Sequence, residues 1–310
     1  MSARVPFRVQ PMLATLVKEP FHAPGWVFEE KYDGFRILAY KEGRKVTLLS
    51  RNAKDRTDHF SSIAERMRAL PHETLLLDGE VVAFDRGSVS RFQLLQNLTN
   101  APRYAVFDCL YVDGRDLRAQ PLRDRRPELE KLLGQSAGKQ AVIFPSARLA
   151  ADGLKAYEMA AKKGFEGLVA KDETSSYMEG RSMKWLKVKV KQEDEFIIVG
   201  YSAPAGAREH FGALLLGAYD GGDLKYVGKV GTGFSQKTLA QLYRNFQPLV
   251  REKPAVVDAP RERDVTWLAP RLVAQIAFGE WTDDRKLRHP VFLGLRDDKA
   301  PSEVMIPEAK

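Results

Sequence analysis

A short polar segment near the start of the chain lies between predicted strands and contains a lysine that could act as a nucleophile. The flanking apolar segments are typical of strands joined by tight turns: residues 26–28, 35–40 and 46–49. Lys31 therefore lies in a predicted loop, just before Asp33 and Gly34. A lysine amine is nucleophilic only when it is uncharged, so its pKa must fall from a reference value of about 10.4. Taken alone, the segment favours a simpler interpretation, in which Lys31 is a surface residue paired with Glu29 or Glu30.

The composition indicates a soluble globular protein whose partner carries negative charge. The net charge is +8 and the pI about 9.4, which favours nucleic acid, although a generally basic surface explains the charge equally well. The single cysteine, Cys109, excludes an internal disulfide and a cysteine zinc cluster. We see neither a secretory signal nor an apolar run of about 18 residues, so we expect a cytoplasmic protein that does not contact membranes.

The pattern of predicted elements changes near residues 191–194, and a length of 310 residues suggests about two domains. Strands and helices are mixed up to residue 191, which predicts an α+β domain with a largely antiparallel sheet. From residue 192 to 310 the predicted strands are short, with glycine-rich turns and one helix at about 236–249. This pattern of short strands with one helix predicts a small β-barrel of the oligonucleotide-binding type, the OB-fold. We therefore expect domains at residues 1–191 and 192–310.

One predicted strand, at residues 184–190, alternates lysines with apolar residues. Successive side chains of a strand point to opposite faces, so Lys187 and Lys189 share one face and Leu186, Val188 and Val190 the other. The apolar face is expected to pack in the core, which leaves the lysine face towards something polar. A solvated outer face is the alternative.

The segment from Lys31 to Arg36 resembles the nucleotidyl-lysine signature Lys-x-Asp-Gly-x-Arg of ATP-dependent DNA ligases, RNA ligases and mRNA capping enzymes. In this superfamily the lysine attacks the α-phosphate of a nucleoside triphosphate and forms a covalent lysyl–nucleotide intermediate. Further segments resemble other motifs of the superfamily, in its order and spacing: residues 50–52, 77–80, 104–108, 166–171 and 185–189. Jointly these matches outweigh the surface interpretation of Lys31.

The resemblance also implies roles for individual residues. Phe107 would stack on adenine, Glu80 would hold the ribose hydroxyls and Glu166 would serve a divalent metal, Mg²⁺ or Mn²⁺. Considered singly, Glu80 and Glu166 are more simply explained as surface acids, and Phe107 as a ring in the core. Lys187 and Lys189 would be catalytic cations at the α-phosphate. The residues implied to contact the ATP cofactor are Glu29, Lys31, Arg36, Arg51, Glu80, Phe107, Arg181 and Lys187.

A motif near residue 299 narrows the resemblance to one group of ligases. Residues 287–299 resemble the last ligase motif, Arg-x-Asp-Lys, with Arg296 and Lys299 as its catalytic cations. This longer form, with residues 11–14 and Trp281, is similar to the ligase domain of bacterial end-joining ligases of the D type. We expect the second domain to close over the nucleotide for the first step only, with both cations on the β- and γ-phosphates. Ordinary surface charges are the alternative.

The resemblance implies an ATP-dependent DNA ligase that seals 5′-phosphate/3′-hydroxyl nicks in duplex DNA. It also implies a monomer that acts in double-strand-break repair beside a Ku-like end-binding protein. An RNA ligase or a GTP-dependent capping enzyme is one alternative, against which the extended last motif argues. A non-catalytic nucleic-acid-binding protein with an OB-fold is another, and it would bind DNA whether or not Lys31 and ATP were present.

Overall fold

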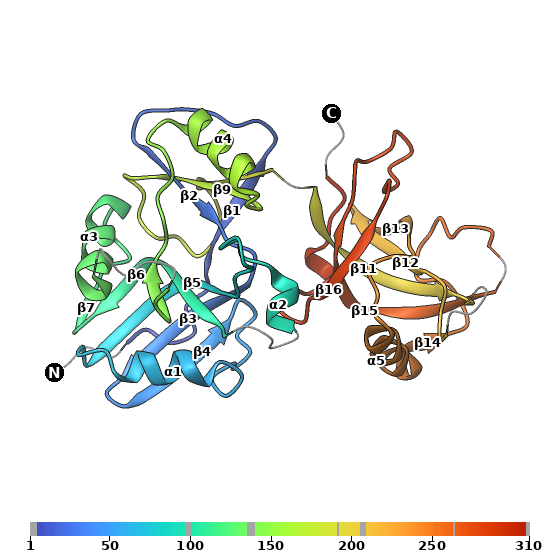
Figure 1. Ribbon diagram of the computed structural model, residues 1–310, viewed down its shortest axis with the longest axis horizontal. Helices are drawn as coiled ribbons and strands as arrows, with labels where there is room; N and C mark the ends of the chain where they lie inside the picture. The colour runs from blue at the N-terminus through green and yellow to red at the C-terminus, as the bar shows by residue number, and fades with distance from the viewer. Residues whose placement is uncertain are drawn as a thin grey trace. The chain divides into compact units, whose positions relative to one another are not determined.

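The computed structural model describes residues 5–96, 101–134, 140–190, 192–204, 209–262 and 264–307. The chain divides into two compact units, Met1–Lys191 and Gln192–Lys310 (Figure 1). Within the described residues, no helix combines the length and the hydrophobicity that crossing a bilayer requires.

The first unit contains two sheets. The smaller sheet has the order β1-β10-β9-β2; as far as the structure describes it, the β1–β10 pair is parallel and the other two pairs are antiparallel. Its strands are β1 (Met12–Val17), β2 (Trp26–Lys31), β9 (Gly167–Asp172) and β10 (Gly180–Lys189). The larger sheet has the order β4-β3-β5-β6-β7, and β8 pairs parallel to β6. Its strands are β3 (Phe35–Glu42), β4 (Lys45–Ser50), β5 (Thr74–Val82), β6 (Arg103–Val112), β7 (Arg115–Asp116) and β8 (Ile143–Pro145).

Helices cover the outer faces of these sheets, and the inner faces pack against each other. The helices are α1 (Ser61–Arg68), α2 (Phe92–Gln96), α3 (Leu122–Leu133) and α4 (Gly153–Lys163). Helix α1 buries Ile63 and Met67 against the larger sheet, and α4 buries Ala156 against Leu186 and Val188 of the smaller one. Between the sheets, Trp185 of β10 packs in one cluster with residues of β3, β5 and β6. The resulting layers, helix–sheet–sheet–helix, are visible in Figure 1.

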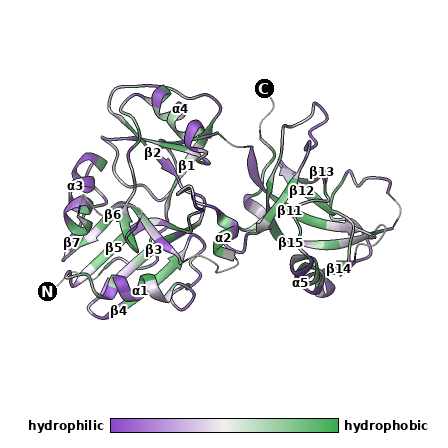
Figure 2. Cartoon of the chain, in the orientation of Figure 1, coloured by the Kyte–Doolittle hydropathy of each residue, from purple (hydrophilic) through white to green (hydrophobic). Residues whose placement is uncertain are grey.

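The second unit is built on one antiparallel sheet of order β13-β12-β11-β15-β14, with β16 paired to β15. Its strands are β11 (Glu193–Ser202), β12 (Leu214–Asp220), β13 (Asp223–Val230), β14 (Val250–Arg251), β15 (Val265–Ala277) and β16 (Val291–Leu295). Helix α5 (Gln236–Phe246) packs Leu239, Leu242 and Phe246 into the core of this unit. Short 3₁₀ helices follow at Gln247–Leu249 and Pro301–Glu303. In both units the hydrophobic residues are concentrated along the strands (Figure 2).

The predicted α+β class, with mostly antiparallel sheets, is confirmed, and three local predictions change. Lys31 is the last residue of β2 and does not lie in the loop that follows. The break expected at Asp78–Gly79 is a bulge against β6 within one continuous strand, β5. The helix expected at 236–249 ends its α-helical part at Phe246. The boundary residue Lys191 lies outside the described residues.

The turn after β2 requires a glycine for steric reasons. A Cβ atom added at Gly34 would lie 2.0 Å from the carbonyl oxygen of Val81 in β5. Next to it, Asp33 accepts a hydrogen bond from the backbone N–H of Phe92 at 3.0 Å, which fixes the start of α2. The turn is therefore held against β5 on one side and α2 on the other.

We predict that Gly34→Ala destabilises the first unit by about 3 kcal/mol, because a rigid backbone atom occupies the space of the new methyl group. Hydrogen exchange of β3 and β5, followed by mass spectrometry, should become faster. Gly87→Ala is the control: its Cβ would approach only the Asp85 side chain, at 3.3 Å. Equal protection of β3 and β5 in the two variants would contradict the steric argument.

Candidate active site

One face of the smaller sheet carries a group of lysines. Lys31 of β2 and Lys189 of β10 both lie opposite Gly167 of the intervening strand β9. On the same face, two residues along β9, Val169 lies opposite both Glu29 and Lys187. The alternate residues of the same strands face α4: Phe28, Leu168, Ala170, Leu186 and Val188. The structure therefore brings Lys31, Lys187 and Lys189 together on the inner face of this sheet.

Glu166 lies directly beside the candidate nucleophile. Its Oε1 atom is 2.5 Å from Lys31 Nζ, and both side chains are largely buried. The next residue, Gly167, lets β9 and β10 approach closely, since a Cβ there would lie 2.1 Å from the carbonyl oxygen of Val188. A buried carboxylate next to a lysine can hold its ammonium group or bind a hard cation.

The inner face of the larger sheet lies opposite these lysines and forms the second wall of the candidate site. Arg36 of β3 donates from Nε and Nη2 to the two oxygens of Asp78, at 2.6 and 2.7 Å, and from Nη2 to the Met12 carbonyl at 3.1 Å. Tyr177 donates its hydroxyl to Asp78 at 2.7 Å. Burial lowers the pKa of Arg36, but Asp78 outweighs it and raises that pKa above its usual value. Glu80 lies opposite Arg36 in the β3–β5 pairing.

Phe107 of β6 is enclosed by cations and by a second ring. The guanidinium of Arg36 lies 4.4 Å and Lys171 Nζ 4.6 Å from its ring centroid. The indole of Trp185 packs edge-on at 5.9 Å. Only 9% of Phe107 is exposed. Stacking of adenine on this ring therefore requires that a neighbouring cation move.

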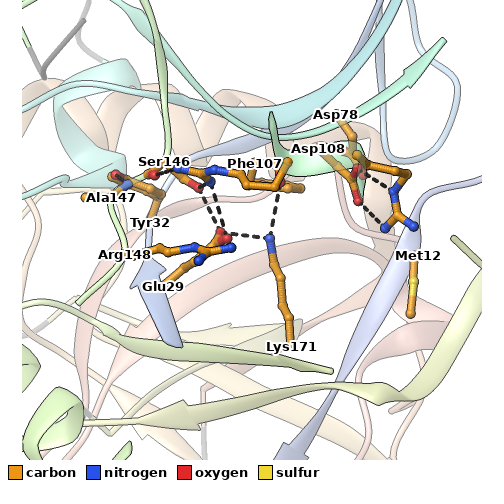
Figure 3. Close-up of polar contacts among 12 residues, drawn as sticks. Met12, Glu29, Tyr32, Asp78, Phe107, Asp108, Ser146, Ala147, Arg148 and Lys171 are labelled. Carbon is orange, nitrogen blue, oxygen red and sulfur yellow. Dashed lines mark hydrogen bonds and ion pairs between the residues drawn. The ribbon is translucent and has the colours of Figure 1, made fainter. Parts of the chain in front are cut away.

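Glu29 forms a buried cluster with three donors (Figure 3). Its Oε2 atom accepts from Ser146 Oγ at 2.7 Å and from Lys171 Nζ at 2.8 Å, and its Oε1 atom lies 3.4 Å from Arg126 Nη1. Burial raises the pKa of Glu29, but Lys171 and Arg126 outweigh it and hold that pKa below its usual value. Only 2% of Glu29 is exposed, which leaves little of its surface for a nucleotide.

The other predicted site residues are spread over both units. Arg51 lies in the turn directly after β4. Arg181 is the second residue of β10, is exposed, and donates to the Ala14 carbonyl at 3.2 Å. In the second unit, Arg296 donates from Nε and Nη2 to Asp298, both at 2.9 Å, and from Nη1 to Gln275 at 3.0 Å. Lys299 pairs with Glu195 at 3.3 Å.

A divalent metal fits this site only with help from a substrate. Among the described residues, no group of three or more His, Cys, Asp or Glu side chains is arranged to hold a metal ion. Magnesium at phosphate sites commonly uses one or two carboxylates together with phosphate oxygens and water. Glu166, beside Lys31, matches that pattern as a single protein ligand.

Sequence reasoning missed Lys171 and Arg126, although both carried a signal. Lys171 shares the strand face of Gly167 and Val169, by the same alternation that placed Lys187 and Lys189. Arg126 lies four residues after Leu122 on the apolar side of α3, a position at which an arginine needs a buried partner.

Comparison with known proteins is consistent with this geometry. A family model described as "ATP dependent DNA ligase domain" matches residues 11–189, and one described as "ATP dependent DNA ligase C terminal region" matches residues 207–299. The chain is 36% identical to the multifunctional non-homologous end joining protein LigD of Pseudomonas aeruginosa, over 97% of this chain and 37% of that protein. It is 33% identical to a DNA ligase of Thermococcus fumicolans, over 95% of this chain and 57% of that protein.

Comparison with solved structures also finds DNA ligases. A mycobacterial DNA ligase D complexed with ATP and MES is 34% identical, with a TM-score of 0.73 over 98% of this chain and 100% of that chain. The ligase domain of Mycobacterium tuberculosis LigD is also 34% identical, with a TM-score of 0.54 over 97% and 99% of the two chains. The chain therefore belongs to the family of ATP-dependent DNA ligases, which confirms the resemblance found in its motifs. It spans less than two fifths of the length of the LigD proteins that it matches.

We predict that the buried Arg296–Asp298 pair makes the second unit sensitive to acid. Burial raises the pKa of Asp298, but Arg296 outweighs it and holds that pKa below its usual value. The pair therefore contributes its full stability above the unfolded pKa of about 3.9 and loses it as the pH falls through the folded pKa. Asp298→Asn should cost about 3–5 kcal/mol near neutral pH, because it leaves Arg296 buried without its countercharge.

Thermal melts of wild type and Asp298→Asn between pH 3 and pH 7 test this prediction. The gap between the two melting temperatures should shrink below about pH 4. A gap that stayed constant down to pH 3 would show that the ionised pair contributes no stability.

Proposed function

We propose that this chain is a ligase that seals 5′-phosphate/3′-hydroxyl nicks in duplex DNA through a covalent lysyl-AMP intermediate. The observation that carries the proposal is the placement of Lys31, Lys187 and Lys189 on one inner sheet face, with Glu166 in contact with Lys31. The names of the relatives, DNA ligase and LigD, support it. The ATP in the mycobacterial ligase D structure supports ATP as the cofactor.

The nucleotide would be held between the two walls. Phe107 offers a flat apolar ring for adenine once a cation has moved from it, and Glu80 lies beside Arg36 where it can accept from ribose hydroxyls. Lys187 and Lys189 place positive charge for the α-phosphate on the same face as Lys31. We assign Arg51 and Arg181 to the same nucleotide site on the motif resemblance.

In the first step, Lys31 Nζ would form a bond to the α-phosphorus while the bond to pyrophosphate breaks on the opposite side. Lys31 must first lose a proton and its ion pair with Glu166, since an ammonium group cannot attack. A divalent cation bound by Glu166, with phosphate oxygens and water, would neutralise charge on the α-phosphate. Lys187 and Lys189 would stabilise the negative charge that concentrates on the equatorial oxygens.

Two further steps would complete the reaction. AMP would pass from Lys31 to the 5′-phosphate of the nick, and the 3′-hydroxyl would then attack that phosphate and displace AMP. Lys187 and Lys189 can serve all three steps, because in each step a phosphate is attacked and its negative charge needs cations beside it. The net charge of +8 supports binding of the DNA backbone.

Arg296 and Lys299 are proposed to act in the first step only, on the β- and γ-phosphates. The first unit would supply groups for the adenosine and the α-phosphate, whereas pyrophosphate also needs cations. Domain closure of this kind is a general way to complete a site and then reopen it for a second substrate.

The pathway that we propose is end joining of broken DNA. The enzyme would act as a monomer in the cytoplasm and would use Mg²⁺ or Mn²⁺. The LigD relatives are named as non-homologous end joining proteins, which supports that pathway. A Ku-like partner rests on the resemblance alone. Labelled ATP and GTP distinguish the proposal from a capping enzyme, because only the nucleotide that is used becomes protein-bound.

Lys31→Ala should abolish the added AMP and the sealing of ordinary nicks, but leave DNA affinity within a few-fold, because backbone contacts are distributed over many cations. Mass spectrometry after incubation with ATP and magnesium measures the adduct, and a gel assay measures sealing. Lys45→Ala, at an exposed end of β4, is the matched control. An AMP adduct on the Lys31→Ala protein would refute the assignment of the nucleophile.

Lys299→Ala should slow adenylylation of Lys31 about 10-fold to 100-fold, yet seal a nick that already carries 5′-AMP within about twofold of wild type. Lys299 is a better probe than Arg296, because its ion pair with Glu195 can be lost with less damage to the fold. Lys225→Ala is the control in the same unit, because it also removes an ion pair, with Asp223 at 3.7 Å on β13. Equal loss of both activities would rule out a role confined to the first step.

A further inference from the structure

The candidate nucleophile lies on an edge strand. In the order β1-β10-β9-β2, strand β2 pairs with β9 along one side only. Its other side contacts residues 146–149: the N–H of Glu30 donates to the Ala147 carbonyl at 3.2 Å, and the N–H of Leu149 donates to the Phe28 carbonyl at 2.8 Å. The position of Lys31 therefore depends on what fixes residues 146–149.

The same segment begins on the strand that carries Phe107. Strand β8 pairs with β6 from Tyr104 to Val106, and the N–H of Ser146 donates to the Val106 carbonyl at 2.6 Å. Residues 143–149 thus run from the strand of Phe107, in the larger sheet, to the strand of Lys31, in the smaller one. Any shift of this bridging segment changes the separation between the aromatic ring and the lysine.

Arg126 of α3 fixes the bridging segment at its midpoint. Its Nη2 atom donates to the Ser146 carbonyl at 2.7 Å and its Nη1 atom to Ser146 Oγ at 3.1 Å, while Nη1 also lies 3.4 Å from Glu29 Oε1. Ser146 Oγ in turn donates to Glu29 at 2.7 Å. Glu29 lies two residues before Lys31 on the same strand face. One guanidinium therefore connects α3, the bridging segment and the strand of the nucleophile.

Helix α3 has packing contacts other than those of Arg126. Leu122 and Leu129 are buried, and Arg125 donates to both oxygens of Asp108 at 2.8 and 2.7 Å. The Arg126 contacts to Ser146 and Glu29 are thus additional to those that hold the helix. Only 7% of the Arg126 side chain is exposed, so water competes little for these bonds.

We propose that Arg126 is a positioning residue for adenylylation: through Ser146 and Glu29 it sets the edge strand of Lys31 at the correct distance from the strand of Phe107. The inference rests on the proposed function of Lys31. In-line attack needs the amine near the α-phosphorus, and a misplacement of about 1 Å can reduce a rate about 100-fold. Glu29 then acts by holding its own strand, and need not contact the nucleotide.

The test compares Arg126→Gln, Arg126→Lys and Leu129→Ala in the full chain, after removal of bound AMP with pyrophosphate. Leu129→Ala is the matched control, because it weakens the same helix from a buried apolar position without touching Ser146 or Glu29. Single-turnover formation of the AMP adduct is measured at increasing ATP concentration. Sealing of a nick that already carries 5′-AMP is measured in parallel.

Arg126→Gln should slow adduct formation at saturating ATP about 10-fold to 100-fold, change the half-saturating ATP concentration by less than about threefold, and leave sealing of the adenylylated nick within about threefold. Arg126→Lys should recover part of the rate, since it keeps the charge beside Glu29 but lacks the fork that also reaches Ser146. Leu129→Ala should keep the wild-type rate under conditions where it is folded.

An unchanged rate in Arg126→Gln would overturn the inference, and so would equal losses in Arg126→Gln and Leu129→Ala. If Arg126→Gln does not fold, Ser146→Ala decides: it removes one hydrogen bond from Glu29, and a wild-type adenylylation rate would count against the inference. Absence of an adduct in the wild-type protein would instead refute the proposed function, so the two failures are distinguishable.

Discussion

Buried carboxylates between the two sheets of the first unit constrain how those sheets can pack. Glu29, Asp78 and Asp108 are each at most 2% exposed, and each is paired with an arginine: Arg126, Arg36 and Arg125. Removing one partner of a buried pair costs several kcal/mol, so these pairs must form together with the fold. They hold β2 and β6 at fixed positions, because shifting either strand would leave a charge buried without its partner.

This constraint also shapes how a nucleotide enters. Arg36 and Lys171 lie 4.4 and 4.6 Å from the centroid of the Phe107 ring, so an adenine that stacked there, as we propose, would replace one of them. The Lys171 side chain is 2% exposed and bound to Glu29, whereas that of Arg36 is 17% exposed. If adenine binds this ring, we therefore expect it to approach from the Arg36 side.

The sequence predicted most of what depends on local periodicity and less of what depends on distant contacts. Alternation along residues 184–190 placed Lys187 and Lys189 on one face, and strand patterns predicted the α+β class. Local patterns could not show that Glu29 pairs with Lys171, 142 residues away, or with Arg126, 97 residues away. Nor could they show that Asp78–Gly79 continues a strand, because the bulge there depends on β6.

The two cations of the second unit differ in how readily they could reach a phosphate. Arg296 donates to Asp298 and to Gln275, and only 7% of its side chain is exposed, so its orientation is set before any substrate binds. A preorganised guanidinium loses little rotamer entropy on binding. Lys299 has a long flexible side chain and an ion pair with Glu195 that a phosphate could replace. If both cations contact the pyrophosphate, as we propose, Arg296 would set its direction and Lys299 would follow it as it departs.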